Sequence, residues 1–100
     1  MTFPNGTESK TTFWSDFSIA DAFGVKAIKD TYKRAFEEWK TNVEYLTELV
    51  IVLNLKCWDH YYKGHQQISE VYSDLYYKAH RYAQSHLKGK DFEYYFNMTD

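Results

Sequence analysis

Cys57 and His60 come closest, in type and spacing, to a chemical site. They lie three residues apart in a segment predicted to be helical, so both side chains can face one ligand. A structural zinc site needs four ligands and a catalytic one needs three. The chain has no Cys-x-x-Cys or His-Glu-x-x-His motif, and the other histidines lie beyond Gly64. We therefore expect no bound metal and no cofactor.

The sequence does not support a catalytic thiol nucleophile either. A reactive cysteine needs an electropositive, partly exposed setting, whereas Cys57 continues an apolar stripe with Leu49 and Leu53. No glutamate is followed by a histidine three residues on, as a di-iron bundle requires. Pairs such as Glu44 and Glu48 are expected on a solvated face, and the histidines are expected to be half-exposed. No catalytic residue is predicted, and the protein is not expected to be an enzyme.

A helix-turn-helix over residues 19–34 is the alternative function, that of a DNA-binding regulator. Residues 19–25 resemble the first helix and turn of that motif, with a small residue four positions before Gly24. Its DNA-binding side chains would be Lys26, Lys29, Lys33 and Arg34. The second half departs from the motif, because Asp30 and Lys33 stand where apolar residues belong. The net charge is −2, whereas nucleic-acid binders usually carry a basic excess, so a nucleic-acid partner is not expected.

Tyrosine is the most distinctive residue of the chain. The sequence holds 10 Tyr, 7 Phe and 3 Trp, which is more aromatic surface than a small core needs. Tyr and Trp are favoured in protein interfaces because they offer rigid contact area. We expect a docking surface near one end of the two longest helices, formed by Tyr61, Tyr62, Tyr76 and Tyr77. The alternative is that these rings lie over the edge of the core with their hydroxyls in water.

The helices that must position these residues follow from the hydrophobic periodicity. Helices are predicted over residues 15–23, 25–41, 43–63 and 66–87, with a short last element after Asp91. Ser15 or Asp16 is expected to cap the first helix, and Gly24 and Gly64 are expected to end the first and third. Short connections favour antiparallel neighbours. The predicted fold is all-α, a bundle of three long antiparallel helices with short helices at both ends.

The third segment, residues 43–63, carries apolar residues on two sides. One stripe runs from Leu46 to Cys57, and the second consists of Ile51, Leu55, Trp58 and Tyr62. A helix that is apolar on two sides is expected to be central, with neighbours packed on both.

The composition indicates the cellular compartment and the number of domains. Residues 1–11 lack hydrophobic periodicity and are expected to form a flexible N-terminal tail, and residues 12–100 to form a single helical domain. Cys57 is the one cysteine, which excludes an internal disulfide and fits a reducing compartment. The longest apolar run, residues 49–53, is far too short for a bilayer. A cytoplasmic protein without membrane contact is therefore expected.

Several segments resemble one family. They are residues 13–17, 19–24, 30–40, 45–49 and 86–89. In these segments the chain resembles small uncharacterised helical proteins carried by Firmicutes gut bacteria and by their phages and conjugative elements. The resemblance implies a bacterial cytoplasmic setting and an accessory role in a mobile element. Small proteins of this kind often bind one host or element protein, in some cases to block a defence system.

The sequence therefore favours a non-enzymatic protein-binding accessory protein of a bacterial mobile element, with inhibition of a host defence system as one form of that role. The expected partner is a protein of unknown identity. A homodimer is the competing association, because two-fold dimers are the commonest soluble oligomers.

Overall fold

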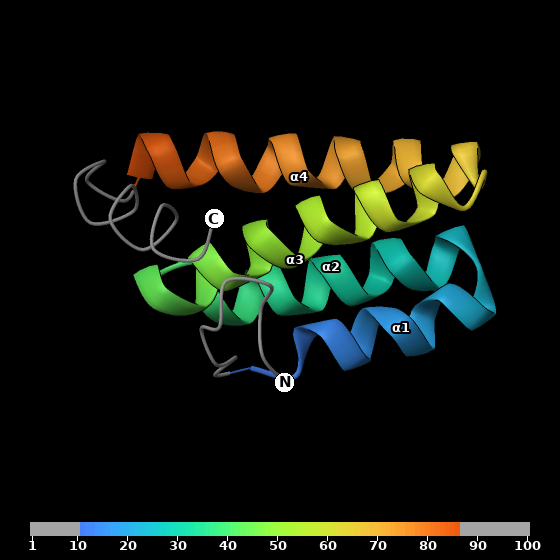
Figure 1. The fold of residues 1–100 in the computed structure, drawn as a ribbon. Helices are drawn as coiled ribbons and strands as arrows, with labels where there is room; N and C mark the ends of the chain where they lie inside the picture. Colours follow the sequence, from blue (N-terminus) through green and yellow to red (C-terminus); the bar gives the residue numbers. More distant parts are fainter. Residues whose placement is uncertain (1–10, 87–100) are drawn as a thin grey trace.

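A computed structural model describes residues 11–86 of the chain, which form four helices (Figure 1). They are α1 (Phe13–Phe23), α2 (Val25–Trp39), α3 (Val43–Tyr62) and α4 (Gln66–His86). No strand occurs in this part of the chain, so the described fold is all-α, as predicted. The predicted element after Asp91 and nearly all of the predicted tail lie outside the described residues.

The helix boundaries show which local signals operate. Helix α3 begins after Asn42, whose side-chain oxygen accepts a hydrogen bond from the Tyr45 amide at 3.0 Å. Helix α1 begins at Phe13, before both of the caps proposed for it, so that prediction was wrong. Its start is fixed by burial instead, because Phe13 packs into the core at 4% exposure.

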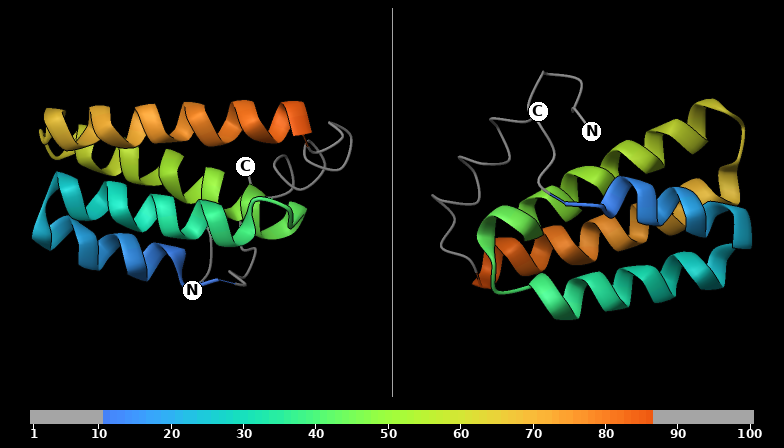
Figure 2. Two further views of the ribbon diagram at one scale, coloured as in Figure 1. Left: turned by 180° about the vertical axis from the view of Figure 1, so that it is seen from behind. Right: turned by 90° about the horizontal axis from the view of Figure 1, so that it is seen from below.

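The four helices form two hairpins. Only Gly24 separates α1 from α2, and the start of α1 lies beside the end of α2, where Phe13 and Trp39 line one groove. Helices α3 and α4 are antiparallel neighbours joined by a short turn, and the Ser69 hydroxyl of α4 donates to the Cys57 carbonyl of α3 at 2.8 Å. Figure 1 and Figure 2 show α1 and α4 on opposite sides of the α2–α3 layer.

Helices α1 and α3 run in the same direction. Near the start of α1, the Thr11 hydroxyl donates to Glu48, and near its end Asp21 meets His60. The carboxyl ends of α1 and α3 therefore lie together, although 39 residues of chain separate the contacting side chains. Glu48 is buried at 7% exposure, so its prediction as a solvated residue was wrong.

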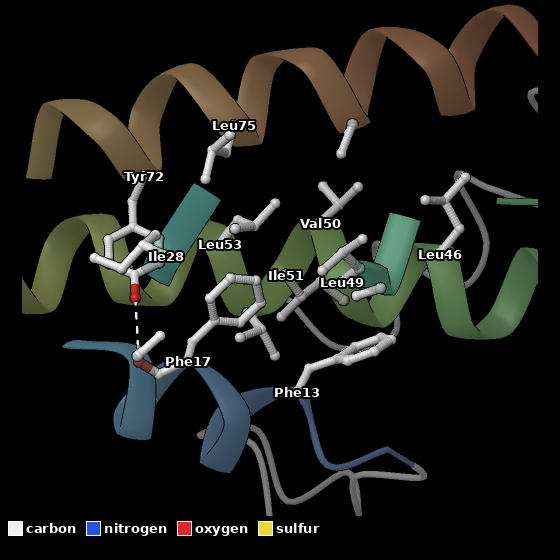
Figure 3. Packing of buried hydrophobic residues seen from close by; sticks show 14 of the residues in the cluster. Phe13, Phe17, Ile28, Leu46, Leu49, Val50, Ile51, Leu53, Tyr72 and Leu75 are labelled. Carbon is white, nitrogen blue, oxygen red and sulfur yellow. Dashed lines mark hydrogen bonds between the residues drawn. The ribbon is translucent and has the colours of Figure 1, made fainter. Parts of the chain in front are cut away.

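The core is built around α3, which is buried without interruption from Leu46 to Leu53. Figure 3 shows Phe13 and Phe17 of α1 pointing toward this helix from one side and Tyr72 and Leu75 of α4 from the other. The Phe17 and Tyr72 rings meet edge to face with centroids 5.7 Å apart. Such pairs add to the area that they bury.

Only the first of the two predicted stripes on α3 is a core stripe along its whole length. In the second, Ile51 is buried and Leu55 packs against the core, but Trp58 and Tyr62 are exposed by 48% and 79%. The helix is central in its first half, whereas its last two turns have one solvated side.

Candidate functional site

Asp21, on the last full turn of α1, joins three helices through its carboxylate. One oxygen accepts from the Lys56 ammonium at 3.1 Å and from His60 Nε2 at 3.0 Å, both on α3. The other accepts from the Tyr72 hydroxyl of α4 at 2.5 Å. We call Asp21, Lys56, His60 and Tyr72 the Asp21 network. None of its members was predicted as a site residue.

The Asp21 network is almost completely removed from water. The side chains of Lys56, His60 and Asp21 are exposed by 4%, 7% and 18%. His60 was expected to be half-exposed, so that prediction was wrong. Burying charges costs free energy unless each is paired and hydrogen-bonded. No buried side-chain polar atom in residues 11–86 lacks a partner, so the network meets that condition.

Two further groups hold Lys56. Its ammonium donates to the Ser18 hydroxyl at 2.7 Å and lies 4.3 Å from the centre of the Trp14 ring, both on α1. A cation over an aromatic face is attracted by the negative face of the ring. Lys56 therefore fastens α3 to two successive turns of α1.

Tyr72 reaches from α4 through the core to α1. Its hydroxyl lies 3.4 Å from the Phe17 carbonyl oxygen (Figure 3) as well as close to Asp21. Burial, and then the hydrogen bond and the negative charge of Asp21, raise the pKa of Tyr72 far above its ordinary value. Tyr72 consequently remains a proton donor to Asp21 over the whole physiological pH range.

The network links α1, α3 and α4, and the hydrogen-bonding groups of Asp21 and His60 are occupied by other side chains. Asp21 already accepts from three side chains, and the second ring nitrogen of His60, Nδ1, lies 3.1 Å from Nδ1 of His65. No hydroxyl or thiol nucleophile contacts His60 through that nitrogen. Residues 11–86 contain no group of three or more His, Cys, Asp or Glu side chains placed to hold a metal ion.

Cys57 is a packing residue in this arrangement. It is half-buried against the core, and its sulfur lies 3.5 Å from the Ser69 hydroxyl of α4. The spacing of Cys57 and His60 suggested that they face one ligand. In the structure His60 points toward Asp21 instead, and no contact between Cys57 and His60 is described.

Three exposed aromatic rings lie next to one another at the end of α3. Trp58, Tyr61 and Tyr62 are exposed by 48%, 60% and 79%. Each ring contacts the other two, with centroid separations of 5.5 to 5.9 Å. We call these residues the aromatic surface. Because Lys56 and His60 both face α1, Trp58, midway between them, points to the opposite side of the helix.

The four predicted docking tyrosines fall into two groups. Tyr61 and Tyr62 belong to the aromatic surface, whereas Tyr76 and Tyr77 form a separate T-shaped pair in the middle of α4, with centroids 5.3 Å apart. Trp58 was not predicted there, because its spacing from Ile51 and Leu55 matched a core stripe. The burial of Lys56 and His60, which turns Trp58 outward, has no signature in the sequence.

The proposed DNA-binding side chains are all exposed on α2. Lys29 shares a groove with Asp74 and Lys78, and Lys33 and Arg34 lie among acidic residues of their own helix. Those acidic residues are Asp30, Glu37 and Glu38. Helices α1 and α2 fold back along each other, whereas the helices of a helix-turn-helix cross at about 90–120°. Because acidic side chains lie among them, the basic residues of α2 form a mixed-charge face.

Comparison with protein-family models, with curated proteins and with solved structures finds no match to the chain. Among the four described helices, none combines the length and the apolar character that a membrane span requires.

Proposed function

We propose that the chain is a non-enzymatic protein-binding module that docks a partner through the aromatic surface at the end of α3. The observation that carries the proposal is the mutual contact of three rings that are each about half or more exposed. Contiguous exposed apolar surface marks interaction sites more often than scattered residues do. Trp and Tyr are also enriched among the residues that dominate binding energy.

Preorganisation supports the same proposal. The rings restrain one another, and the helix that carries them is held from the other side by the Asp21 network, in which His60 directly precedes Tyr61. Ordering fewer side chains on binding lowers the entropic cost of association. The scaffold in this proposal is a bundle of the three longer helices, in which α3 runs antiparallel to both α2 and α4, and the shorter α1 packs along α2 and α3.

The surface indicates the chemistry of the partner. Its rings are uncharged, the phenolic hydroxyls can donate hydrogen bonds, and the neighbouring charges Asp59 and Lys63 neutralise each other at 3.0 Å. We propose a protein partner that presents apolar side chains together with hydrogen-bond acceptors. The resemblance to small proteins of mobile elements supports a bacterial cytoplasmic setting, an accessory role in such an element and, as one form of that role, inhibition of a host defence protein.

The test is affinity capture from a bacterial host lysate after nuclease treatment, with light scattering of the purified chain. The double variant Tyr61→Ala/Tyr62→Ala is expected to lose a stoichiometric partner that the wild type retains, because interface hot spots are worth about 2 kcal/mol or more each. Phe23→Ala, which removes a ring of 78% exposure from α1, is the matched control and should retain the partner.

Retention of the partner by the folded double variant would contradict the proposal. A concentration-dependent dimer that dissociates in the double variant would assign the surface to a second copy of the chain instead. Recovery of nucleic acid alone in a parallel capture without nuclease would favour the basic residues of α2.

A further inference from the structure

The His60 and His65 rings meet across the turn that joins α3 to α4. Their Nδ1 atoms are 3.1 Å apart, and the ring centroids are 5.4 Å apart. The distance between the ring centroids exceeds the distance between the Nδ1 atoms by about one ring radius for each ring. Both nitrogens therefore lie nearly on the line that joins the two centroids. This is the geometry of an N–H···N hydrogen bond. A metal ion bound to both nitrogens would have to lie off that line, with the rings turned toward it.

The orientation of His60 is fixed by Asp21. Its Nε2 lies 3.0 Å from a carboxylate oxygen, which only accepts hydrogen bonds, so Nε2 carries a hydrogen. The other nitrogen, Nδ1, can then either accept from His65 or donate to it. His60 is also held face to face with Tyr72, with centroids 5.5 Å apart and an interplanar angle of 8°.

His65 faces solvent on its other side. It is exposed, and its backbone amide donates to the His60 carbonyl at 2.9 Å, which closes the turn. Gly64, between them in sequence, has φ +80°, a conformation that glycine adopts readily. Protons from water can therefore reach the pair through His65, while His60 stays buried.

The contact has room for one hydrogen between the two rings. With none, two lone pairs face each other. With two, a pair of N–H groups faces each other, and two positive charges also do so once both rings are fully protonated. The pair can therefore be neutral or singly charged while closed, but not doubly charged. Around His60 stand Asp21 of α1, Lys56 of α3 and Tyr72 of α4, and Lys56 already neutralises Asp21. A second positive charge on the pair has no carboxylate of its own.

We propose that the His60–His65 contact is a proton-operated latch on the α3–α4 turn, closed by one shared proton and opened when both rings become charged. The latch acts on the last turn of α3, which carries Tyr61 and Tyr62. Its effect on docking rests on the function proposed above, whereas the latch itself requires no partner.

The latch is tested on the purified chain by imidazole ¹⁵N NMR and amide hydrogen exchange between about pH 8 and pH 5. Because the open state binds one more proton, the protection of the His65 amide, corrected for intrinsic exchange, should fall up to about tenfold per pH unit at the acidic end. The His60 and His65 signals should change together.

Two variants separate the latch from ordinary acid destabilisation. His65→Asn keeps a side-chain N–H that can donate to His60 but does not titrate, so the protection at the turn should become nearly independent of pH. His86→Asn removes an exposed imidazole at the far end of α4 and should behave as the wild type. Circular dichroism confirms that each variant is folded at pH 7.

Protection that does not change with pH in the wild type, or that changes equally in His65→Asn, would overturn the latch. If the latch opens as expected but the captured partner binds equally well at pH 7.5 and pH 5.5, only the regulatory link is overturned. Loss of the proposed docking function would leave the exchange measurement unaffected.

Discussion

At the scale of single residues, the Asp21 carboxylate links three helices. Its removal would leave the Lys56 ammonium at 4% exposure without an anion and take the acceptor from His60 and Tyr72. Breaking a buried ion pair by removing one partner lowers the free energy of unfolding by about 3–5 kcal/mol. Because Asp21 is partly exposed, we expect Asp21→Ala to lie toward the lower end of that range. Urea unfolding at pH 7 measures the loss.

Asp30→Ala is the matched control, because Asp30 is an exposed aspartate on α2 and its loss should change stability by no more than about 0.5 kcal/mol. Equal effects of the two substitutions would show that the network adds little. Sequence could not single out Asp21, because an aspartate near a helix end is ordinary, and lysine and aspartate are rarely buried unless paired. The pairing is a tertiary contact across 35 residues.

At the scale of elements, the hairpin of α1 and α2 depends on one residue. Gly24 has φ +106° and ψ −173°, a backbone conformation that essentially only glycine adopts. An added Cβ would meet no atom within 4 Å, so the penalty of Gly24→Ala is confined to the backbone. We expect a loss of about 1–3 kcal/mol of stability in thermal or urea unfolding. Ser15→Ala, at an exposed helical position, should be nearly neutral, and a similarly small effect of Gly24→Ala would contradict the expectation.

The helices also show how much of the fold could be predicted from the sequence. Gly24 and Gly64 mark the ends of α1 and α3 as predicted, and α2 and α3 end within two residues of their predicted boundaries, because caps, glycines and apolar periodicity are local signals. The side-by-side course of α1 and α3 was not predicted. It depends on Phe13 and Phe17 packing against α3, and on Asp21 meeting His60, none of which has a pattern in the chain.

At the scale of the whole molecule, the half-buried Tyr32 and the buried Tyr72 make the fold sensitive to alkali. Burial raises the pKa of Tyr32 to about 12, and burial with the adjacent Asp21 raises the pKa of Tyr72 further. The unfolded chain releases these protons near pH 10. Above that pH the folded state binds more protons than the unfolded state, so stability must fall as pH rises.

The stabilisation is complete below about pH 10 and is lost as the pH rises through about 12 for Tyr32, while the Tyr72 contribution is still falling there. Each tyrosine contributes a slope of up to about 1.4 kcal/mol per pH unit. Urea unfolding between pH 8 and pH 11.5 measures this slope.

Tyr72→Phe lacks the hydrogen bond to Asp21 and is expected to be less stable than the wild type at pH 8. Its stability should nevertheless fall less steeply with rising pH. Tyr77→Phe, at 62% exposure, should keep the wild-type slope. If Tyr72→Phe and Tyr77→Phe have the same slope, the Tyr72 hydroxyl does not hold its proton in the fold, and its role as a donor to Asp21 is excluded.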